Sequence, residues 1–269
     1  MSEIEKITSR DNQRLVNARK VRDGHDKSRL FIEGRRLVDE ALISKIAIDE
    51  CFYVEDFRDT ELLSTVAAKT PKIVEVSQRL LRSIADTDNS QGIILIAERP
   101  NNGAAAIEDA LTAGSTIVPI VLFLKEINSP SNLGAVLRTA EAAGIAGVVV
   151  SKNSADVYSS KSLRAAMGAS FRVPIWDGAA FDEVLVWSKK LGLKSTAADI
   201  RAVKSYTQID WRVPRLVVFG SEAHGLTASE LTTIDEHLKI PMESGVESLN
   251  LAVSAGVILF EARRQVAND

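Results

Sequence analysis

Three separated blocks in the second half of the chain carry residue types that could do chemistry. They span Asn128–Arg138, Val217–Leu226 and Ile240–Asn250. Each block places glycine, serine, asparagine or a charged residue where a predicted strand ends or a predicted helix begins. Ligands of an open α/β sheet bind at that edge, so the blocks predict one site assembled from distant segments.

The first block follows an apolar strand that ends at Leu124 and precedes a helix predicted over Gly134–Ala143. Either Asn128 or Ser131 could cap this helix, because their short polar side chains accept bonds from the first free N–H groups. Gly134 has no side chain beyond its α-carbon and therefore lets another backbone approach closely.

Arg138 lies one turn after Gly134, on the same face of the predicted helix. A cation so early in a helix opposes the macrodipole, unless an anion faces it. That anion is either a ligand phosphate or a structural carboxylate, for which Glu222 and Glu141 are the candidates.

The second and third blocks supply backbone bends and a helix start. Gly220 and Gly225 permit bends that expose N–H and C=O groups to a ligand, although many strand-to-turn junctions have this pattern. Ser248 stands just before, and Asn250 at the start of, a long apolar helix predicted over Leu249–Gln265. Ser248 is the expected N-cap of this helix. The alternative to a functional role is that capping is its only role.

Alternating strands and helices predict an α/β fold in two units, with a domain over residues 1–99, a linker over 100–116 and a second domain over 117–269. In the first domain, helices are expected at Ile7–Arg22, Arg35–Ser44 and Glu61–Ala68, and strands at Leu30–Gly34, Cys51–Val54, Ile73–Val76 and Gly92–Ala97. In the second, beginning at Ile117, strands are expected at Pro119–Leu124, Gly147–Val150, Arg172–Ile175, Leu193–Thr196 and Leu216–Phe219. Its helices are expected at Gly134–Ala143, Ser160–Met167, Phe181–Leu191 and Leu249–Gln265.

Composition narrows the class of protein. The 269 residues include one cysteine, Cys51, expected to be a buried thiol, and three scattered histidines, so no metal set emerges. The chain shows no signal-peptide pattern at its start and no apolar run of about 18 residues. This suits a soluble bacterial or organellar compartment, and we expect a cytoplasmic protein off the membrane. The net charge is −3, yet residues 1–36 hold ten Lys/Arg against six acids. This balance favours a local phosphate-binding surface over a merely solvated helix.

The order and wording of the three blocks resemble motifs one to three of the SpoU (TrmH) family of RNA ribose 2′-O-methyltransferases, within the SPOUT superfamily. The resemblance implies a deep trefoil knot in the second domain and S-adenosyl-L-methionine as methyl donor. It places the donor against backbone around Gly220, Ile240, Met242 and Leu249, with Thr196 and Ala197 nearby. Catalytic roles fall to Arg138, Asn132, Glu222, Ser248 and Asn250. His224 stands where the motif varies and is not assigned as a base, and Gly245 leaves the loop geometry open.

The stretches Ile7–Asn12 and Arg29–Arg35 resemble the substrate-binding domain of the same family, whose fold is like that of ribosomal protein L30e. The implied RNA-binding residues are Arg10, Asn12, Arg29, Arg35 and Arg164. A homodimer is also implied, because SpoU-like sites are completed across a two-fold interface that includes the motif helices.

We therefore expect an RNA 2′-O-methyltransferase, with ribosomal RNA favoured over transfer RNA. Guanidinium stays protonated in proteins, so Arg138 suits a phosphate clamp and a stabiliser of the developing alkoxide better than a base, and the base is left open. A catalytically silent RNA-binding assembly factor is the first alternative. A Rossmann-type nucleotide enzyme is the second, disfavoured because no G-x-G-x-x-G follows the first strand of the second unit.

Overall fold

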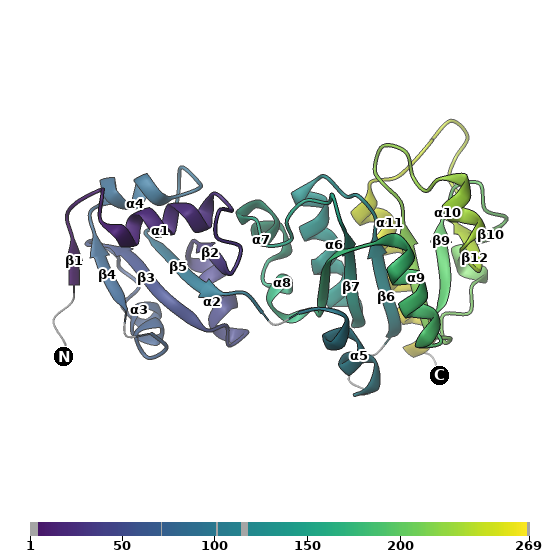
Figure 1. The fold of residues 1–269 in the computed structure, drawn as a ribbon, viewed down its shortest axis with the longest axis horizontal. Coiled ribbons are helices and arrows are strands. Elements are labelled where there is room, and N and C mark those ends of the chain that lie inside the picture. Colours follow the sequence, from purple (N-terminus) through teal and green to yellow (C-terminus); the bar gives the residue numbers. More distant parts are fainter. Residues whose placement is uncertain (1–4, 71, 101, 114–117, 268–269) are drawn as a thin grey trace. The chain divides into compact units, whose positions relative to one another are not determined.

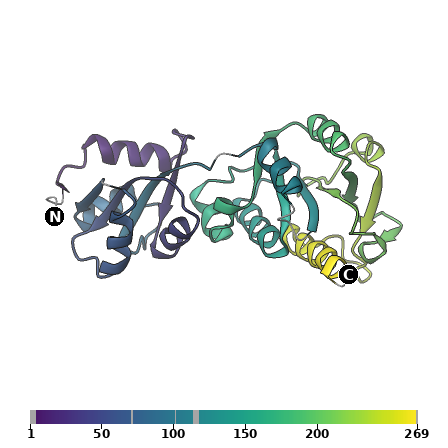
Figure 2. The same cartoon turned by 90° about the horizontal axis from the view of Figure 1, so that it is seen from below.

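The structure is a computed structural model that describes residues 5–70, 72–100, 102–113 and 118–267. The expected start of the second domain at Ile117 lies outside the described residues. The chain divides into two compact units, Met1–Pro100 with Tyr158–Phe171, and Asn101–Val157 with Arg172–Asp269. Both are α/β structures, as the sequence predicts (Figures 1 and 2). The first unit also includes residues 158–171 from the middle of the chain, which the sequence did not indicate.

The first unit is a mixed five-stranded sheet with helices on both faces. Its elements are β1 (Glu5–Ile7), α1 (Gln13–Arg22), β2 (Arg29–Glu33), α2 (Arg35–Ile43), β3 (Ile48–Val54), α3 (Thr60–Ala67), β4 (Ile73–Val76), α4 (Gln78–Ile84), β5 (Ile93–Glu98) and α7 (Ser160–Ala166). The strand order is β1-β4-β3-β5-β2, with β5 antiparallel to its neighbours and the other pairs parallel. Helices α1 and α4 cover one face and α2 and α3 the other (Figure 1). Leu15 and Leu81 pack from α1 and α4 against alternate residues of the strands.

The second unit is a parallel seven-stranded sheet in the order β10-β12-β9-β11-β6-β7-β8. Its elements are α5 (Ala104–Thr112), β6 (Val118–Leu124), α6 (Pro130–Ala143), β7 (Ile145–Ser151), β8 (Ile175–Ala179), α9 (Phe181–Lys190), β9 (Lys194–Ala198), β10 (Lys204–Ser205), β11 (Arg215–Phe219), α10 (Ala228–Thr232), β12 (Glu236–Lys239) and α11 (Leu251–Ala267). Helices α5 and α9 pack on one face, and α6 and α11 on the other (Figure 1). Strand β6 is fully buried apart from Pro119, as expected for a parallel sheet covered on both sides.

Two expected elements are placed differently. The helix expected over Ile7–Arg22 begins only at Gln13, because Ile7 belongs to β1 and Asn12 caps the helix with its side-chain oxygen on the N–H of Arg14 (2.9 Å). The strand expected over Arg172–Ile175 is wrong, since residues 169–172 are helical (α8, Ala169–Arg172) and β8 starts at Ile175. Pro174 has no N–H to donate to a ladder, so the strand forms after it.

The expected linker is wrong over most of its length. Residues 104–112 form α5, and Ile107 on this helix is fully buried. A side chain on Gly147 of β7 would place its Cβ 2.8 Å from Cγ1 of Ile107, so the helix and strand meet closely. The alanine run favours a helix by itself, and the segment belongs to the second unit.

Candidate active site

A cavity of about 630 Å³ opens in the second unit at the carboxyl ends of β9, β11 and β12. The last residues of these strands, Ala198, Phe219 and Lys239, line it, and the first turns of α11 form another wall. Loops from the second and third blocks predicted from the sequence, Asn132 of the first block and residues 199–201 after β9 complete the lining. The cavity therefore lies at the sheet edge where parallel strands expose their free carbonyl groups and loops.

Gly220 is packed against the turn that follows β11. Ser221 and Gly225 close this turn through two backbone hydrogen bonds of 3.1 and 2.9 Å, and Gly225 adopts a φ of +64°. A Cβ on Gly220 would lie 2.2 Å from the carbonyl carbon of Gly225 and 2.5 Å from the nitrogen of Leu226. Only glycine fits, because backbone atoms cannot move aside as a flexible side chain could.

Three of the five predicted catalytic residues form one directed chain of hydrogen bonds, and each comes from a different block. The amide nitrogen of Asn132 donates to the carboxylate of Glu222, and the amide nitrogen of Asn250 donates to the amide oxygen of Asn132 at 3.0 Å. The oxygen of Asn250 accepts from the N–H of Ala252 at 2.9 Å. A carboxylate only accepts, so the direction of every bond in this chain is determined.

These contacts correct the predicted helix caps. Asn250, not Ser248, caps α11, and Ser129, rather than Asn128 or Ser131, caps α6 by accepting from the N–H of Asn132 at 3.3 Å. Ser248 is exposed and lines the cavity, so the interpretation that it serves only as a cap is wrong.

Helices α6 and α11 run side by side along one face of the sheet. Asn132 and Asn250 join their first turns, and Arg263 donates to the carbonyl of Ala142 at 2.5 Å near their ends. Between these points a Cβ on Gly256 would be 3.8 Å from the methyl group of Thr139. This pairing brings motif one next to motif three.

Arg138 lies outside the cavity lining of its own chain. It is exposed and makes no hydrogen bond or ion pair with any residue in the described ranges. The two structural partners considered from the sequence are engaged elsewhere, since Glu222 accepts from Asn132 and Glu141 binds Arg172. Helix α6 begins at Pro130, one turn earlier than expected, so Arg138 sits beyond the second turn. The macrodipole argument for Arg138 is therefore wrong, because the effect fades within the first turn.

The predicted cofactor-binding residues separate into two groups. Gly220, Ile240, Met242 and Leu249 line the cavity. Thr196 and Ala197 are fully buried within β9, and the lining begins one residue later with Ala198 and continues through Asp199 and Arg201. Ser254 and Ile258 of α11 also line the cavity and were not singled out from the sequence, although their i, i+4 spacing on the motif-three helix is a usable signal.

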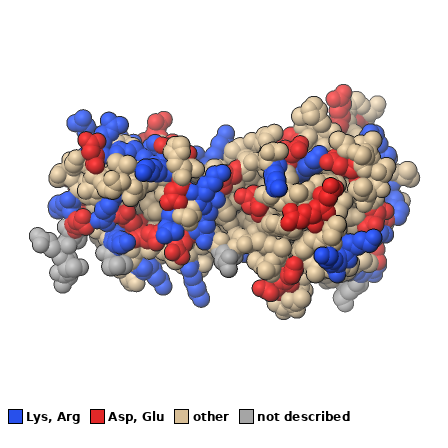
Figure 3. Space-filling model, viewed as in Figure 1, with Lys and Arg blue, Asp and Glu red and all other residues tan. Residues whose placement is uncertain are grey.

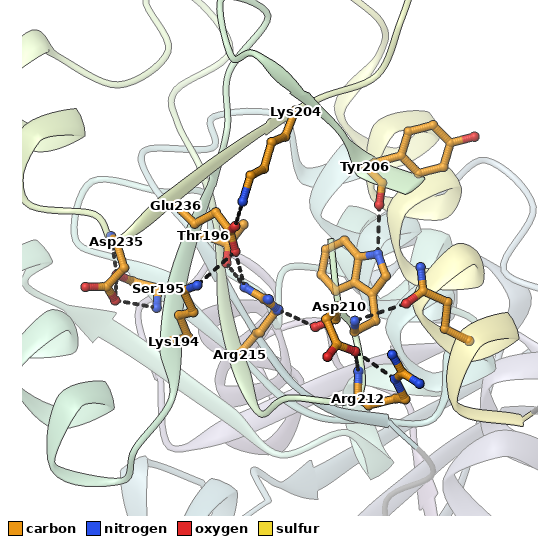
Figure 4. A network of polar contacts seen from close by, with 12 residues as sticks. Lys194, Ser195, Thr196, Lys204, Tyr206, Asp210, Arg212, Arg215, Asp235 and Glu236 are labelled. Carbon is orange, nitrogen blue, oxygen red and sulfur yellow. Dashed lines mark hydrogen bonds and ion pairs between the residues drawn. The ribbon is translucent and has the colours of Figure 1, made fainter. Parts of the chain in front are cut away.

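Thr196 belongs instead to a buried polar network beneath the strand ends (Figure 4). Arg215, 2% exposed, donates to the hydroxyl of Thr196 at 2.9 Å, to the carboxylate of Glu236 at 2.8 Å and to the carbonyl of Asp210 at 3.0 Å. Lys204 binds the other oxygen of Glu236 at 2.5 Å. The network ties β9, β10, β11 and β12 together and so supports the strands that end at the cavity.

Glu236 makes this network sensitive to acid. Burial raises the pKa of its carboxyl, but hydrogen bonds from Lys204 and Arg215 and the charge of Arg215 outweigh burial and lower the pKa to about 2. The ionised form is thus bound more tightly in the folded state than in the unfolded state, where the pKa is about 4.5. The stabilisation is complete above pH 4.5 and is lost as the pH falls from there to about 2.

We expect Glu236→Gln to lower the free energy of unfolding by about 3 kcal/mol at pH 7, because Arg215 stays buried without its carboxylate. The difference from the parent protein should shrink by more than half on going to pH 3. Urea denaturation followed by circular dichroism at a series of pH values measures both. Glu243→Gln, at an exposed carboxylate with no side-chain partner among the described residues, is the control. A difference that does not change with pH would contradict the linkage.

The predicted RNA-binding residues of the first unit mostly have structural partners. Arg29 binds Asp49, Arg35 binds Asp59 at 2.5 Å, and Arg164 of α7 binds Asp86 at 2.7 Å. Asn12 is the cap of α1, and Arg10 is exposed without a side-chain partner among the described residues. On the face in Figure 3, the Lys and Arg side chains of this unit lie among carboxylates. The basic amino-terminal segment therefore does not form a uniform cationic patch on this face.

Other predictions concern the thiol, metals and the membrane. Cys51 is fully buried, as predicted, and burial raises the pKa of its thiol to about 12. Across the described ranges, no group of three His, Cys, Asp or Glu side chains is arranged to hold a metal ion. No helix formed by those residues is both long and apolar enough to cross a bilayer.

Comparison with known proteins finds a matching family for each of the two units. Residues 119–260 match the SpoU rRNA Methylase family, and residues 10–95 match the MRM3-like substrate binding domain. The 23S rRNA (guanosine-2′-O-)-methyltransferase RlmB of Ralstonia nicotianae is 31% identical over 89% of this chain and 96% of that protein. RlmP of Bacillus subtilis, a 23S rRNA (guanosine(2553)-2′-O)-methyltransferase, is 26% identical over 97% of this chain and all of that protein.

The crystal structure of an AdoMet-bound rRNA methyltransferase from Sinorhizobium meliloti matches with a TM-score of 0.82 and 26% identity, covering 97% of this chain and 98% of that one. The chain belongs to the SpoU rRNA methylase family. This confirms the family resemblance and the order of the two domains, a substrate-binding domain followed by a SpoU domain. The trefoil knot stays a prediction.

Proposed function

We propose that this protein transfers a methyl group from S-adenosyl-L-methionine to a ribose 2′-hydroxyl of ribosomal RNA. The observation that carries the proposal is the chain Glu222–Asn132–Asn250, which joins the three family motifs at the mouth of a single cavity. The relatives named for 23S rRNA methylation match over almost their whole length, which favours ribosomal over transfer RNA. A bacterial 23S rRNA substrate, as named for the RlmB and RlmP relatives, would place the protein in the cytoplasm.

The cavity fits the donor by its chemistry. Gly220 lines the cavity and its backbone is fixed by close packing against the 221–225 turn, and Ile240, Met242 and Leu249 add apolar surface suited to an adenine ring. Asp199 and Glu247 line the same cavity and supply carboxylates, which suit ribose hydroxyls and an ammonium group. The bound donor supplies an electrophilic methyl group on a sulfonium, so no covalent enzyme intermediate is required.

The protein residues would then position the acceptor. Asn132 and Asn250 are held rigidly by their mutual hydrogen bond, so their orientation is set before RNA arrives. Arg138 is free to bind a phosphate beside the target ribose and to stabilise negative charge that develops on the 2′-oxygen. Alignment of oxygen and methyl group supplies much of the rate enhancement.

Transfer of tritium from methyl-labelled donor tests this function. Deproteinised 23S rRNA and bulk transfer RNA are offered separately, and the product is hydrolysed in alkali. A 2′-O-methyl group blocks cleavage at its own nucleotide, so label is expected in an alkali-resistant dinucleotide from 23S rRNA. Label only in transfer RNA would favour the tRNA alternative. Donor binding by calorimetry with no transfer to either RNA would favour the silent assembly factor.

A homodimer is part of the proposal, because Arg138 does not reach the cavity of its own chain. Val253 and Phe260 lie two turns apart on α11 and are 51% and 50% exposed, which leaves an apolar stripe beside α6. A two-fold interface over this stripe would bury the apolar side chains and bring Arg138 of one protomer toward the cavity of its partner.

We expect Val253→Glu to produce a monomer and to lower methyl transfer by at least tenfold, while donor affinity is retained. The new carboxylate lies near the start of α11, where the macrodipole favours it, so the fold should persist. The matched control is Val186→Glu, at a valine of α9 that is 56% exposed. Sedimentation at micromolar concentration and single-turnover transfer are the measurements. A monomeric parent protein with full activity would remove the dimer from the proposal.

A further inference from the structure

The first unit contains its own hollow, of about 440 Å³, where the parallel strands β3 and β4 end and β5 begins. Its lining comes from three segments, the loop 54–59 after β3, Gln78 and Arg82 of α4, and the loop 88–92 before β5. The residues assigned to RNA from the family resemblance are absent from this lining. The hollow is therefore lined by polar and apolar groups to which the proposed function assigns no role.

Two cations at the hollow lack partners. Arg58 and Arg82 are exposed, and neither makes a side-chain hydrogen bond or ion pair with any residue the structure describes. Arg29, Arg35 and Arg164, in contrast, each bind a carboxylate. A guanidinium that is not engaged within the fold can bind a phosphate with two parallel hydrogen bonds.

The rest of the lining suits a nucleobase. Phe57 is partly buried against the core and gives the hollow an apolar surface. Gln78 donates its amide nitrogen to Asp56 at 3.2 Å, which leaves its oxygen available, and Asn89 accepts from the N–H of Gln91 at 3.3 Å, which leaves its NH₂ available. Asp88 is exposed and adds an acceptor. Donors, acceptors and an apolar surface together are what unpaired bases of RNA require.

The rim of the hollow is held rigidly. Glu33, 6% exposed, accepts from the N–H of Asp86 at 2.7 Å and of Thr87 at 3.2 Å, which fixes the start of the loop. The side chain of Gln91 accepts from the N–H of Arg35 at 2.8 Å, and Gly92 takes a φ of +80°. A loop that is already ordered loses less entropy when it binds.

We propose that this hollow holds one unpaired nucleotide of the substrate RNA, with Arg58 and Arg82 on its phosphates and with Gln78, Asn89 and Asp88 at the edge of its base. The inference rests on the proposed function and deepens it, because it assigns recognition of a flexible, unpaired part of the RNA to the first unit. Duplex RNA would not fit, since its bases are stacked and paired.

The test uses the full chain and a fluorescein-labelled single-stranded RNA of twelve nucleotides of mixed sequence, with anisotropy measured over a range of KCl concentrations. The variant Arg58→Ala/Arg82→Ala should bind at least tenfold more weakly, and the slope of log affinity against log salt should become shallower by about 1.4. The charge-matched control is Lys69→Ala/Lys72→Ala, at two exposed lysines of the same unit outside the hollow. Its affinity should change by less than twofold.

A second variant separates base recognition from charge. Gln78→Ala/Asn89→Ala should weaken binding of the twelve-nucleotide RNA severalfold and leave binding of an abasic RNA with the same phosphates unchanged. Loss of affinity for both RNAs would contradict base recognition in the hollow. Thermal unfolding followed by circular dichroism verifies that each variant keeps the fold of the first unit, and calorimetry with S-adenosyl-L-methionine verifies the second unit separately.

The two proposals fail in different ways. If the parent protein methylates 23S rRNA, and Arg58→Ala/Arg82→Ala binds RNA no more weakly than the lysine control, the hollow is not the recognition site and the proposed function stands. If the parent protein binds the donor but neither binds nor methylates any RNA, the proposed function is wrong. The proposed nucleotide site in the hollow is then wrong as well.

Discussion

Arg138→Ala is expected to lower the single-turnover rate of methyl transfer by about a hundredfold or more at saturating RNA. That is the scale for removing one electrostatic donor from a transition state. The guanidinium is exposed and unpaired within the described part of the chain, so no structural role competes with binding a phosphate. Donor affinity should be unchanged, because Arg138 does not line the cavity of its own chain and is proposed to bind a phosphate of the RNA.

Two further variants make this result specific. Arg138→Lys should restore only part of the rate, because an ammonium group cannot grip a phosphate through two parallel bonds. Lys190→Ala removes a cation from the exposed side of α9 and should leave the rate unchanged. If Arg138→Ala transfers methyl at the parent rate once RNA is saturating, Arg138 has no part in the chemical step.

Gly220→Ala is expected to abolish binding of S-adenosyl-L-methionine. The added Cβ would lie 2.2 Å from a backbone carbon of Gly225, so the 221–225 turn has to move and the cavity wall moves with it. The larger Gly220→Val should give the same loss. Isothermal titration calorimetry measures it, and circular dichroism verifies that the sheet is retained.

Gly256→Ala is the matched control, because its Cβ would meet nothing closer than 3.8 Å and alanine is the better helix former. It should bind the donor normally and be at least as stable as the parent protein. A folded Gly220→Ala protein with normal donor affinity would show that the donor is not held against this turn.

Much of the architecture could be predicted from local patterns. The apolar runs of β6, β7 and β11 are long enough to identify buried parallel strands, and the helix of motif one is marked by Pro130 and Gly144 at its two ends. Three short elements, α4, α10 and β12, were missed. Ser77 and Thr227, which cap α4 and α10 through their side chains, are the signals that could have found those two helices.

The sequence by itself indicated which residues would meet at one edge of the sheet, and the structure joins three of them by hydrogen bonds. Asn132, Glu222 and Asn250 are separated by up to 118 residues, yet their types and their places at strand and helix ends predicted one site. Gly220 was also predicted, since a glycine directly after a buried strand indicates close backbone approach. These inferences succeed because they depend on local backbone conformation, which the neighbouring residues largely decide.

Only the tertiary structure decided what each of those side chains contacts. Asn250 became the cap of α11 and a donor to Asn132, Thr196 became a partner of buried Arg215, and Arg138 was left free. Segment 158–171 joined the first unit although the sequence places it deep within the second. Such contacts join residues far apart in the chain, and packing selects them from many partners of equal chemistry, so no local pattern encodes them.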